Sequence, residues 1–261
     1  MDNVSKTLYI PLYGKAYVSR KGILLKDKMA EEIWQREGFP LKGKAASKWL
    51  AYHMGMRAKV FDAWIEERLA EQPHAVVLHI GCGLDSRSER VDRHGREWFD
   101  IDFPEVIAER RKYFREGEGY HLLSADIREQ GWEEAVPGGR AIVVMEGISM
   151  YLQPKELLQL LQRLRTHFEQ MDLLMDCYTT FGAKATKYKN PINEVGVTVA
   201  YGMDDPKGLA DAAGFAYVAE HSLTPAHLIA QLPNKEQGIF RALFAGKFAR
   251  KLYRLYEFKK A

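Results

Sequence analysis

The sequence predicts an α/β fold in which a doubly wound, mostly parallel sheet is preceded by a helical cap. Three observations favour this fold. A short β-branched run over 76–80 leads into a Gly-Cys-Gly turn at 81–83, and the acid Asp102 follows about 20 residues later. Further strand-like runs alternate with helix-like segments towards the end of the chain. Residues 1–72 show helical periodicity instead. Runs that are apolar throughout are typical of parallel strands buried on both faces.

Length and composition indicate one globular domain. The chain has 261 residues, of which 46% are hydrophobic, and it can bury a large core without splitting in two. We expect one domain over 1–261. Its parts are a helical cap or lid over 1–72, a cofactor-binding core over 73–180, and a segment over 181–261 that completes the sheet and contributes a substrate-side insertion.

Charge and residue usage argue against several partners. The net charge of +3 is too small to predict nucleic-acid binding. The N-terminus has no signal-peptide pattern and nowhere do 18 apolar residues run together, so we expect no membrane span and a cytoplasmic location. The two cysteines, Cys82 and Cys177, form no CxxC pair and predict neither a disulfide nor a metal site.

The Gly-Cys-Gly turn predicts a ligand that the backbone approaches closely, because Gly81 and Gly83 carry no Cβ. The dinucleotide fingerprint has a third glycine where this sequence has Ser86, which Asp85 precedes. A carboxylate beside the turn repels phosphate and tolerates a cationic ligand. S-adenosylmethionine, with its sulfonium and ammonium groups, meets these requirements.

Three successive predicted strands finish in a carboxylate. Asp102 ends the second strand, Asp126 ends a third over 120–126, and Glu146 lies near the end of a fourth over 140–147. Ligands of open α/β sheets bind at the carboxyl ends of the strands, so we expect the three acids to share one crevice. Asp102 suits ribose hydroxyls, Asp126 an adenine amine and Glu146 a methionyl ammonium. For any one of them alone, a helix N-cap is the alternative.

The cap is predicted to be helical because its apolar residues recur at helical spacing. Met29, Ile33 and Trp34 share one face, and a later helix over 58–70 ends before Pro73. The region is rich in aromatic residues. Two interpretations stay open, a lid over the cofactor and a helical layer packed on the sheet.

The remaining elements follow from the same patterns. Helices begin at Pro104 and Pro154, a strand covers 171–178, and the unpatterned stretch 179–201 suggests a substrate-side insertion. The chain then continues with a helix over 206–213 capped by Gly214, a strand over 215–222, a helical segment over 225–246 and a final strand over 251–258.

A set of motifs over about residues 5–180 carries a resemblance to a known family. The motifs are Gly14-Lys15-Ala16, the segment 26–30, Arg57 before a helix, the Leu-Asp-Ser-Arg extension of the glycine turn at 84–87, Asp-Phe-Pro at 102–104, Ala125-Asp126-Ile127-Arg128, and Met145-Glu146-Gly147 followed by 148–152. The chain resembles the leucine carboxyl methyltransferase family, and within it the bacterial branch of tetracenomycin-type O-methyltransferases. Cys82 departs from the alanine that is more usual there.

The resemblance implies a class I S-adenosylmethionine-dependent methyltransferase fold, which is Rossmann-like and has a mostly parallel seven-stranded sheet with an antiparallel last strand. It implies an S-adenosylmethionine-dependent O-methyltransferase. It also implies a set of cofactor-binding residues: Lys15 and Arg57 at the cofactor carboxylate, Gly81 and Gly83 under the methionine part, and Asp102, Asp126, the backbone of Ile127, and Glu146 for the rest.

The methyl acceptor is expected to be a small molecule, such as a polyketide-like or other secondary metabolite, that reacts through a carboxylate or a hydroxyl. An ionised carboxylate needs no base, whereas a hydroxyl needs one, for which His53 and His121 are candidates. No obligatory catalytic side chain is implied. Tyr151 is a further candidate catalytic residue, and with Tyr178 and Phe181 it is a candidate for the wall of an acceptor pocket. Core packing is the alternative for each of the three.

Other functions stay open at this point. One is methylation of a protein C-terminal carboxylate. Another is a nicotinamide oxidoreductase or a catalytically silent nucleotide-binding module, although Ser86 and the three acids argue against nicotinamide. His79, inside the first strand, is expected to be a hydrogen-bonded core residue. The sequence predicts no particular oligomeric state.

Overall fold

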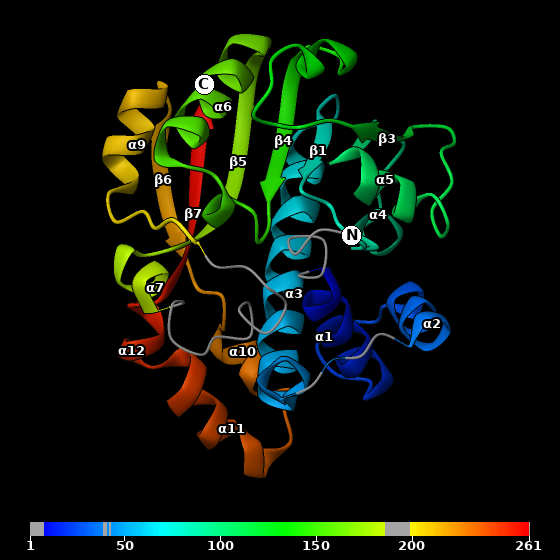
Figure 1. Cartoon of the computed structure of the whole chain (residues 1–261), viewed down its shortest axis with the longest axis vertical. Helices are drawn as coiled ribbons and strands as arrows, with labels where there is room; N and C mark the ends of the chain where they lie inside the picture. Colours follow the sequence, from blue (N-terminus) through cyan, green and yellow to red (C-terminus); the bar gives the residue numbers. More distant parts are fainter. Residues whose placement is uncertain (1–7, 39–40, 42, 186–198, 261) are drawn as a thin grey trace.

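The strands form one seven-stranded sheet in the order β3-β2-β1-β4-β5-β7-β6 (Figure 1). A computed structural model describes residues 8–38, 41, 43–185 and 199–260. Neighbouring strands from β3 to β5 pair in parallel, and β7 is antiparallel to both β5 and β6, which confirms the predicted antiparallel last strand. The strands are β1 (Val76–Ile80), β2 (Trp98–Asp102), β3 (Tyr120–Ser124), β4 (Gly139–Met145), β5 (Phe168–Tyr178), β6 (Ala216–His221) and β7 (Tyr253–Lys260).

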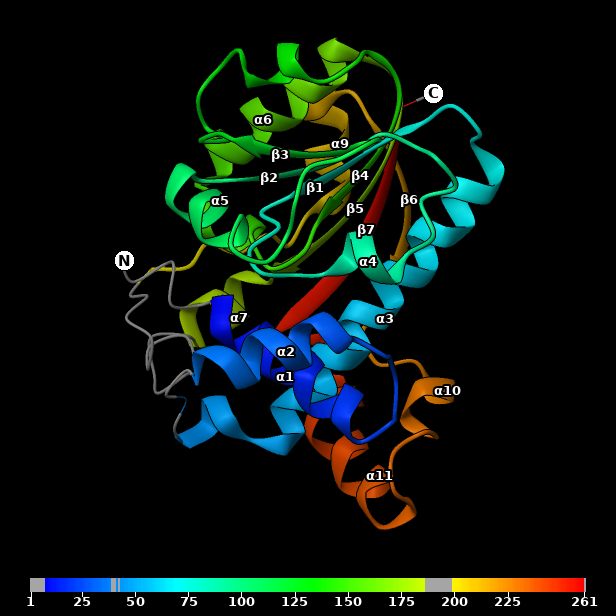
Figure 2. The ribbon, with the colours of Figure 1, turned by 90° about the vertical axis from the view of Figure 1, so that its right-hand side faces the viewer.

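Helices surround the sheet and extend well beyond its carboxyl edge. Figures 1 and 2 show the sheet in the upper half of the molecule and α1, α2, α10 and α11 in the lower half, with α3 running through both. None of the described helices combines the length and the apolar character that a membrane span needs. The principal helices are α1 (Tyr9–Arg20), α2 (Lys28–Glu37), α3 (Lys48–Glu71), α4 (Arg87–Arg90), α5 (Pro104–Arg110), α6 (Pro154–His167), α7 (Thr180–Ala185), α9 (Pro206–Ala213), α10 (Ala226–Ile229), α11 (Asn234–Phe240) and α12 (Lys247–Arg250).

The core lies on both faces of the sheet. Successive residues of a strand point to opposite faces. Leu78 of β1 and Val143 of β4 therefore share one cluster with residues of α6 and α9, whereas Val77 and Ile142 share the other with residues of α3. All five residues of β1 are buried, as its continuously apolar sequence predicts.

Two helical boundaries differ from the prediction. The helix α3 begins at Lys48, with Ser47 as its N-cap, and not near residue 58. Tyr52 and Met56 pack in a cluster with Leu228 of α10, so the first turns of α3 are buried on more than the sheet-facing side and show no single apolar stripe. The predicted helix over 225–246 is broken in the structure, since Pro233 stands as the N-cap of α11.

The boundary at Gly214 agrees with the prediction, because its left-handed backbone ends α9. In the predicted insertion over 179–201, the described residues include the helix α7, and residues 186–198 lie outside the described part of the chain.

Removing buried volume from β4 should destabilise the whole domain. The side chain of Ile142 is fully buried on the face of the sheet that α3 covers. Ile142→Ala therefore leaves a cavity and should lower the free energy of unfolding by about 2–5 kcal/mol. Urea titration followed by circular dichroism measures this loss. The control is Ile239→Ala on α11, where the side chain is 51% exposed and the expected change is within about 0.5 kcal/mol. Equal losses in both variants would contradict the assigned core.

Candidate functional site

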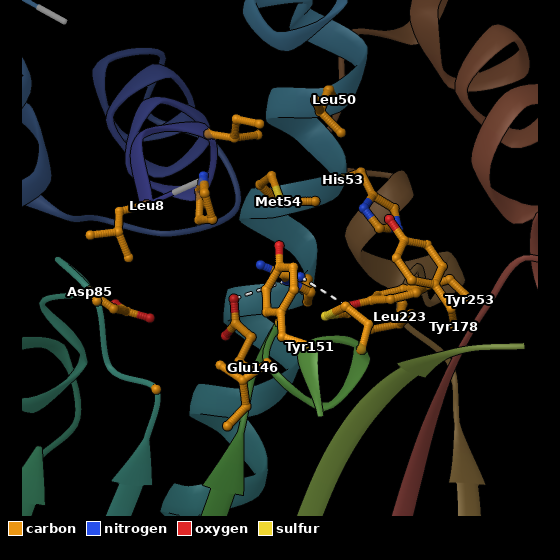
Figure 3. A pocket seen from close by; sticks show the side chains of 18 of the residues that line it. Leu8, Leu50, His53, Met54, Asp85, Glu146, Tyr151, Tyr178, Leu223 and Tyr253 are labelled. Carbon is orange, nitrogen blue, oxygen red and sulfur yellow. Dashed lines mark hydrogen bonds and ion pairs between the residues drawn. The ribbon is translucent and has the colours of Figure 1, made fainter. Parts of the chain in front are cut away.

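A cavity of about 1440 Å³ opens at the carboxyl edge of the parallel strands. Strand ends and the glycine turn form one side, and residues of α1 and α3 form another (Figure 3). Sites for one small ligand occupy roughly 300–1,000 Å³, so this cavity has room for a cofactor and an acceptor together. The cavity lining includes every residue that the sequence assigns to the cofactor: Lys15, Arg57, Gly81, Gly83, Asp102, Asp126, Ile127 and Glu146.

The glycine turn has a backbone that other residues adopt with strain. The φ angles are +72° at Gly81 and +52° at Gly83, both in the left-handed region. A Cβ at Gly81 would overlap the side chain of Ile148, and one at Gly83 would lie 2.8 Å from Cδ2 of Leu8. The two glycines therefore allow Ile148 and Leu8 to pack closely against the turn, and both line the cavity.

Asp102 ends β2 beside this turn. One carboxylate oxygen accepts a hydrogen bond of 2.8 Å from the backbone N–H of Gly83, and the other accepts one of 2.8 Å from that of Phe103. Each carboxylate oxygen has a second lone pair, so the group can still accept hydrogen bonds from a ligand. Burial raises the pKa of Asp102 to about 6, and the two backbone donors only partly offset it. Asp102 thus changes charge near neutral pH.

Asp126 and Ile127 line the cavity just after β3. The carboxylate of Asp126 accepts three hydrogen bonds from the guanidinium of Arg128, at 2.9 Å and 3.1 Å from Nε and at 2.6 Å from Nη2. Hydrogen bonds from Arg128 lower the pKa of Asp126. The pair stands at the exposed rim of the site, where an ion pair contributes little to stability.

Glu146 follows β4 and is buried between two arginines. Its Oε1 lies 2.9 Å from Nε of Arg57, and its Oε2 accepts a hydrogen bond from Arg87. Burial by itself would raise the pKa of Glu146, but the two guanidinium groups outweigh it and hold the pKa at about 2. Arg57 also lies 3.3 Å from Asp176 and donates to the hydroxyl of Tyr253 at 3.2 Å. Glu146 is therefore ionised at neutral pH.

Lys15 is buried, and its Nζ lies 3.0 Å from the carboxylate of Asp85. Asp85 also pairs with Arg90 at 2.8 Å and with Arg87 at 3.3 Å. Although burial alone would raise the pKa of Asp85, these three cations hold it well below its usual value. Contrary to the expectation from the sequence, Asp85 does not present a free negative charge that would repel a phosphate, because three cations of the protein compensate it.

Of the residues that connect these groups, the sequence named Asp27 and Arg87 only as members of motifs and did not single out Asp62 or Arg90. Asp62 of α3 lies 2.8 Å from Nε of Arg87 and 2.9 Å from Nε of Arg90. Asp27, the N-cap of α2, lies 2.6 Å from Nη1 of Arg90. One signal was present, since Asp62 falls within the apolar stretch of α3 and a charged residue there indicates a buried partner. Glu146, Arg57, Lys15 and Asp85 join these residues in what we call the edge network.

Of the candidate catalytic residues, His53 and Tyr151 line the cavity and His121 does not. His121 lies on β3, stacked on Phe99 with ring centroids 4.5 Å apart, and its Nε2 lies 2.5 Å from Glu97. This placement does not support its assignment as a candidate base, because His121 lies near the start of β3 whereas the cavity opens at the carboxyl ends of the strands.

The acceptor-wall candidates divide in a similar way. Tyr178 lines the cavity, but Phe181 does not and is 54% exposed, with Phe248 as its ring neighbour. His79 is a hydrogen-bonded core residue as predicted, since its Nδ1 lies 3.0 Å from Asp100 and its Nε2 lies 3.1 Å from Arg87. Within the described residues no group of three or more His, Cys, Asp and Glu side chains is arranged to hold a metal ion.

Solved structures share this fold at low sequence identity. One is a putative methyltransferase from Thermobifida fusca, with a TM-score of 0.58, 14% identity and coverage of 95% of this chain and 94% of the other. Another is magnesium protoporphyrin IX methyltransferase from Synechocystis with bound S-adenosylhomocysteine, with a TM-score of 0.53, 14% identity and coverage of 88% and 93%. The fold is the Rossmann-like fold of S-adenosylmethionine-dependent methyltransferases.

Sequence comparison gives the family. The tetracenomycin polyketide synthesis O-methyltransferase of Streptomyces glaucescens is 29% identical over 97% of both chains. An S-adenosylmethionine-dependent methyltransferase of Gibberella zeae is 28% identical over 80% of this chain and 78% of its own. Residues 8–165 match the model of the leucine carboxyl methyltransferase family. With more than half of its length in that match, the chain belongs to the leucine carboxyl methyltransferase family.

Proposed function

We propose that this S-adenosylmethionine-dependent O-methyltransferase methylates the carboxylate of a small molecule. The observation that carries the proposal is the cavity itself. All the residues predicted to bind the cofactor line it, although they come from three strand ends, the glycine turn and two helices, and its volume is larger than one ligand needs. When bound, the cofactor supplies an electrophilic methyl group on a sulfonium. The protein then has to hold the acceptor oxygen in line with it, and such positioning can account for roughly 7–11 kcal/mol of the barrier.

The residues present fit a cationic adenosyl cofactor. Asp102 keeps lone pairs for the ribose hydroxyls, and Lys15 has N–H donors beyond its bond to Asp85 for the cofactor carboxylate. The edge network has four cations, Lys15, Arg57, Arg87 and Arg90, and four carboxylates, Asp27, Asp62, Asp85 and Glu146. Asp176, which lies 3.3 Å from Arg57 and is not part of the network, adds a fifth carboxylate beside it. An excess of negative charge favours a ligand with net positive charge.

The acceptor end of the cavity favours a nucleophile that is already ionised. Burial, followed by the charge of Arg57, lowers the pKa of His53 to about 3, so it is a weak base at neutral pH. Burial raises the pKa of Tyr253 well above its usual value. Neither group readily takes a proton from a hydroxyl, whereas a carboxylate is ionised without help.

The small-molecule acceptor is supported by the Streptomyces relative, an O-methyltransferase of tetracenomycin polyketide synthesis. A protein C-terminal carboxylate is the alternative. We also propose that the segment 1–72 works as a lid, since α1 and α3 contribute Lys15, His53 and Arg57 to the cavity. The division of the chain into cap, core and completing segment, the cytoplasmic location and the lack of a nucleic-acid partner stay predictions from the sequence.

Asp102→Asn should weaken binding of S-adenosylmethionine. Ribose hydroxyls donate better to a carboxylate than to an amide, and losing such charge-assisted bonds costs about 1.5–3 kcal/mol, or roughly tenfold to 150-fold in Kd. Isothermal titration calorimetry at pH 7 measures the change. The matched control is Asp211→Asn, which removes the same charge from an exposed position on α9 and should leave Kd unchanged. An Asp102→Asn protein that binds as tightly as the wild type would remove Asp102 from the site.

The same interaction predicts a pH dependence. Asp102, with a pKa of about 6 without ligand, is protonated below that pH, and the cofactor prefers the ionised form. Affinity should therefore fall by about tenfold between pH 7 and pH 5 in the wild type. Asp176, whose pKa burial also raises to about 6, titrates in the same range and is present in both proteins. Calorimetry at pH 7 and pH 5 is therefore done with both the wild type and Asp102→Asn. The difference between their changes in Kd is the contribution of Asp102.

The chemical class of the acceptor is testable with a methyl-labelled cofactor and a panel of aromatic and aliphatic acids, phenols and alcohols. A carboxylate acceptor gives a methyl ester, from which mild alkali releases the label as volatile methanol. Label that survives alkali would indicate an ether and contradict the carboxylate. In a parallel incubation with a cell lysate, label in protein bands would favour the protein acceptor. Excess S-adenosylhomocysteine should suppress all labelling.

A further inference from the structure

The cavity has two ends with different chemistry. Figure 3 shows Asp85 and Leu8 on one side, His53, Tyr178 and Tyr253 on the other, and Glu146 with Tyr151 between them. The first side belongs to the glycine turn and its charges, where the cofactor is proposed to bind. The second side therefore faces the acceptor, and this assignment rests on the proposed function.

His53 lies at the acceptor end of the cavity, and its imidazole makes no hydrogen bond to a described residue. It lines the cavity from α3, and its Nδ1 is enclosed yet has no hydrogen-bond partner among the described residues. The imidazole ring contacts two aromatic rings, with centroids 5.3 Å from that of Phe244 and 6.4 Å from that of Tyr253. Nε2 likewise has no hydrogen-bond partner among the described residues and, unlike Nδ1, is not enclosed by the protein. An unpartnered polar edge in a cavity wall indicates a ligand that binds there.

The protonation of the ring follows from its surroundings. Burial keeps the imidazole neutral at pH 7, so one nitrogen carries a proton and the other does not. An enclosed N–H without an acceptor is the rarer arrangement in proteins. The proton is therefore placed on Nε2, at the edge of the ring away from the enclosed Nδ1, where it is available as a donor.

The walls around His53 suit a flat molecule. Phe244 lies in a π-helical segment, Arg241–Ala245, and its ring is tilted by 31° to that of His53. A π-helical turn inside a helix frequently marks a functional site. Tyr178 and Tyr253 add a second aromatic pair with centroids 5.0 Å apart, and both line the cavity. Aromatic faces favour planar, apolar ligands.

We propose that His53 recognises the methyl acceptor by donating a hydrogen bond from Nε2 to an uncharged oxygen, such as a ring-borne carbonyl, of a planar molecule that packs beside Phe244. His53 is then a specificity-determining residue and not the base of the reaction. An acceptor that lacks this oxygen still fits the walls but loses the hydrogen bond.

The test uses two probes of nearly the same shape, acetophenone and α-methylstyrene, which differ in C=O against C=CH2. Each is titrated by NMR into protein saturated with S-adenosylhomocysteine, and the measured quantity is the ratio of the two Kd values. His53→Phe keeps a ring and removes both nitrogens, so the preference for acetophenone should fall by about fivefold, the effect of one neutral hydrogen bond. Comparing ratios cancels the different hydrophobicity of the probes.

Two further variants make the test specific. His53→Gln places an amide nitrogen near the position of Nε2 and should retain the ratio within about twofold. His121→Gln, outside the cavity, should do the same. In the wild type, acetophenone should also shift the ring CH signals of His53, identified by their absence in His53→Gln. An unchanged ratio in His53→Phe, an unshifted His53 signal, or failure of acetophenone to bind would overturn the proposal.

Calorimetry of S-adenosylhomocysteine with each variant separates the two proposals. If this ligand binds all variants equally and the probe ratio does not respond to His53→Phe, the recognition role is wrong and the cofactor site stands. In the opposite case, S-adenosylhomocysteine does not bind even the wild type, but the ratio of the two probe Kd values, measured without S-adenosylhomocysteine, still changes in His53→Phe. His53 then recognises a ligand, and the proposed function is wrong.

Discussion

The edge network is the interaction on which the site depends. It joins the glycine turn to α1 through Asp85 and Lys15, to α3 through Arg87 and Asp62, and to α2 through Arg90 and Asp27. Removing charges from water costs several kcal/mol per ion, and breaking one buried pair leaves its partner uncompensated. The positions of the helices beyond the sheet edge are therefore fixed by these ion pairs, because moving a helix would separate a buried carboxylate from its cation. The same contacts that fix the cap also shape the cavity.

This arrangement explains how one helix contributes to both the core and the site. The C-terminal half of α3 packs on the sheet through Phe61 and Ile65, whereas its N-terminal half carries His53 and Arg57 into the cavity. The two interpretations of the cap are therefore compatible, since one rigid helix both covers the sheet and reaches over its carboxyl edge. Arg57, paired with Glu146 and Asp176, marks the point where these two parts meet.

Sequence patterns predicted the parts of the fold that depend on local periodicity and on the strand-end rule. The seven strands, the capping role of Gly214 and the meeting of Asp102, Asp126 and Glu146 at one cavity follow from such patterns. The start of α3 did not, because burial on several sides removes the one-sided stripe. His121 and Phe181, both expected at the site, do not line the cavity. Side-chain direction depends on register and on neighbouring elements, which a single sequence does not specify.

The sequence by itself determined the order of elements, the open backbone at Gly81 and Gly83, and the carboxylates at the ends of three strands, because these depend on residue type and on spacing along the chain. Only the tertiary structure decided which charges compensate each other and which polar groups stay unpaired. Asp85 is neutralised by cations from α1 and α4, whereas Nδ1 of His53 has no partner in the described chain. Pairing of this kind is a matter of distances of a few ångströms between segments far apart in sequence, and the packing of helices on the sheet sets those distances.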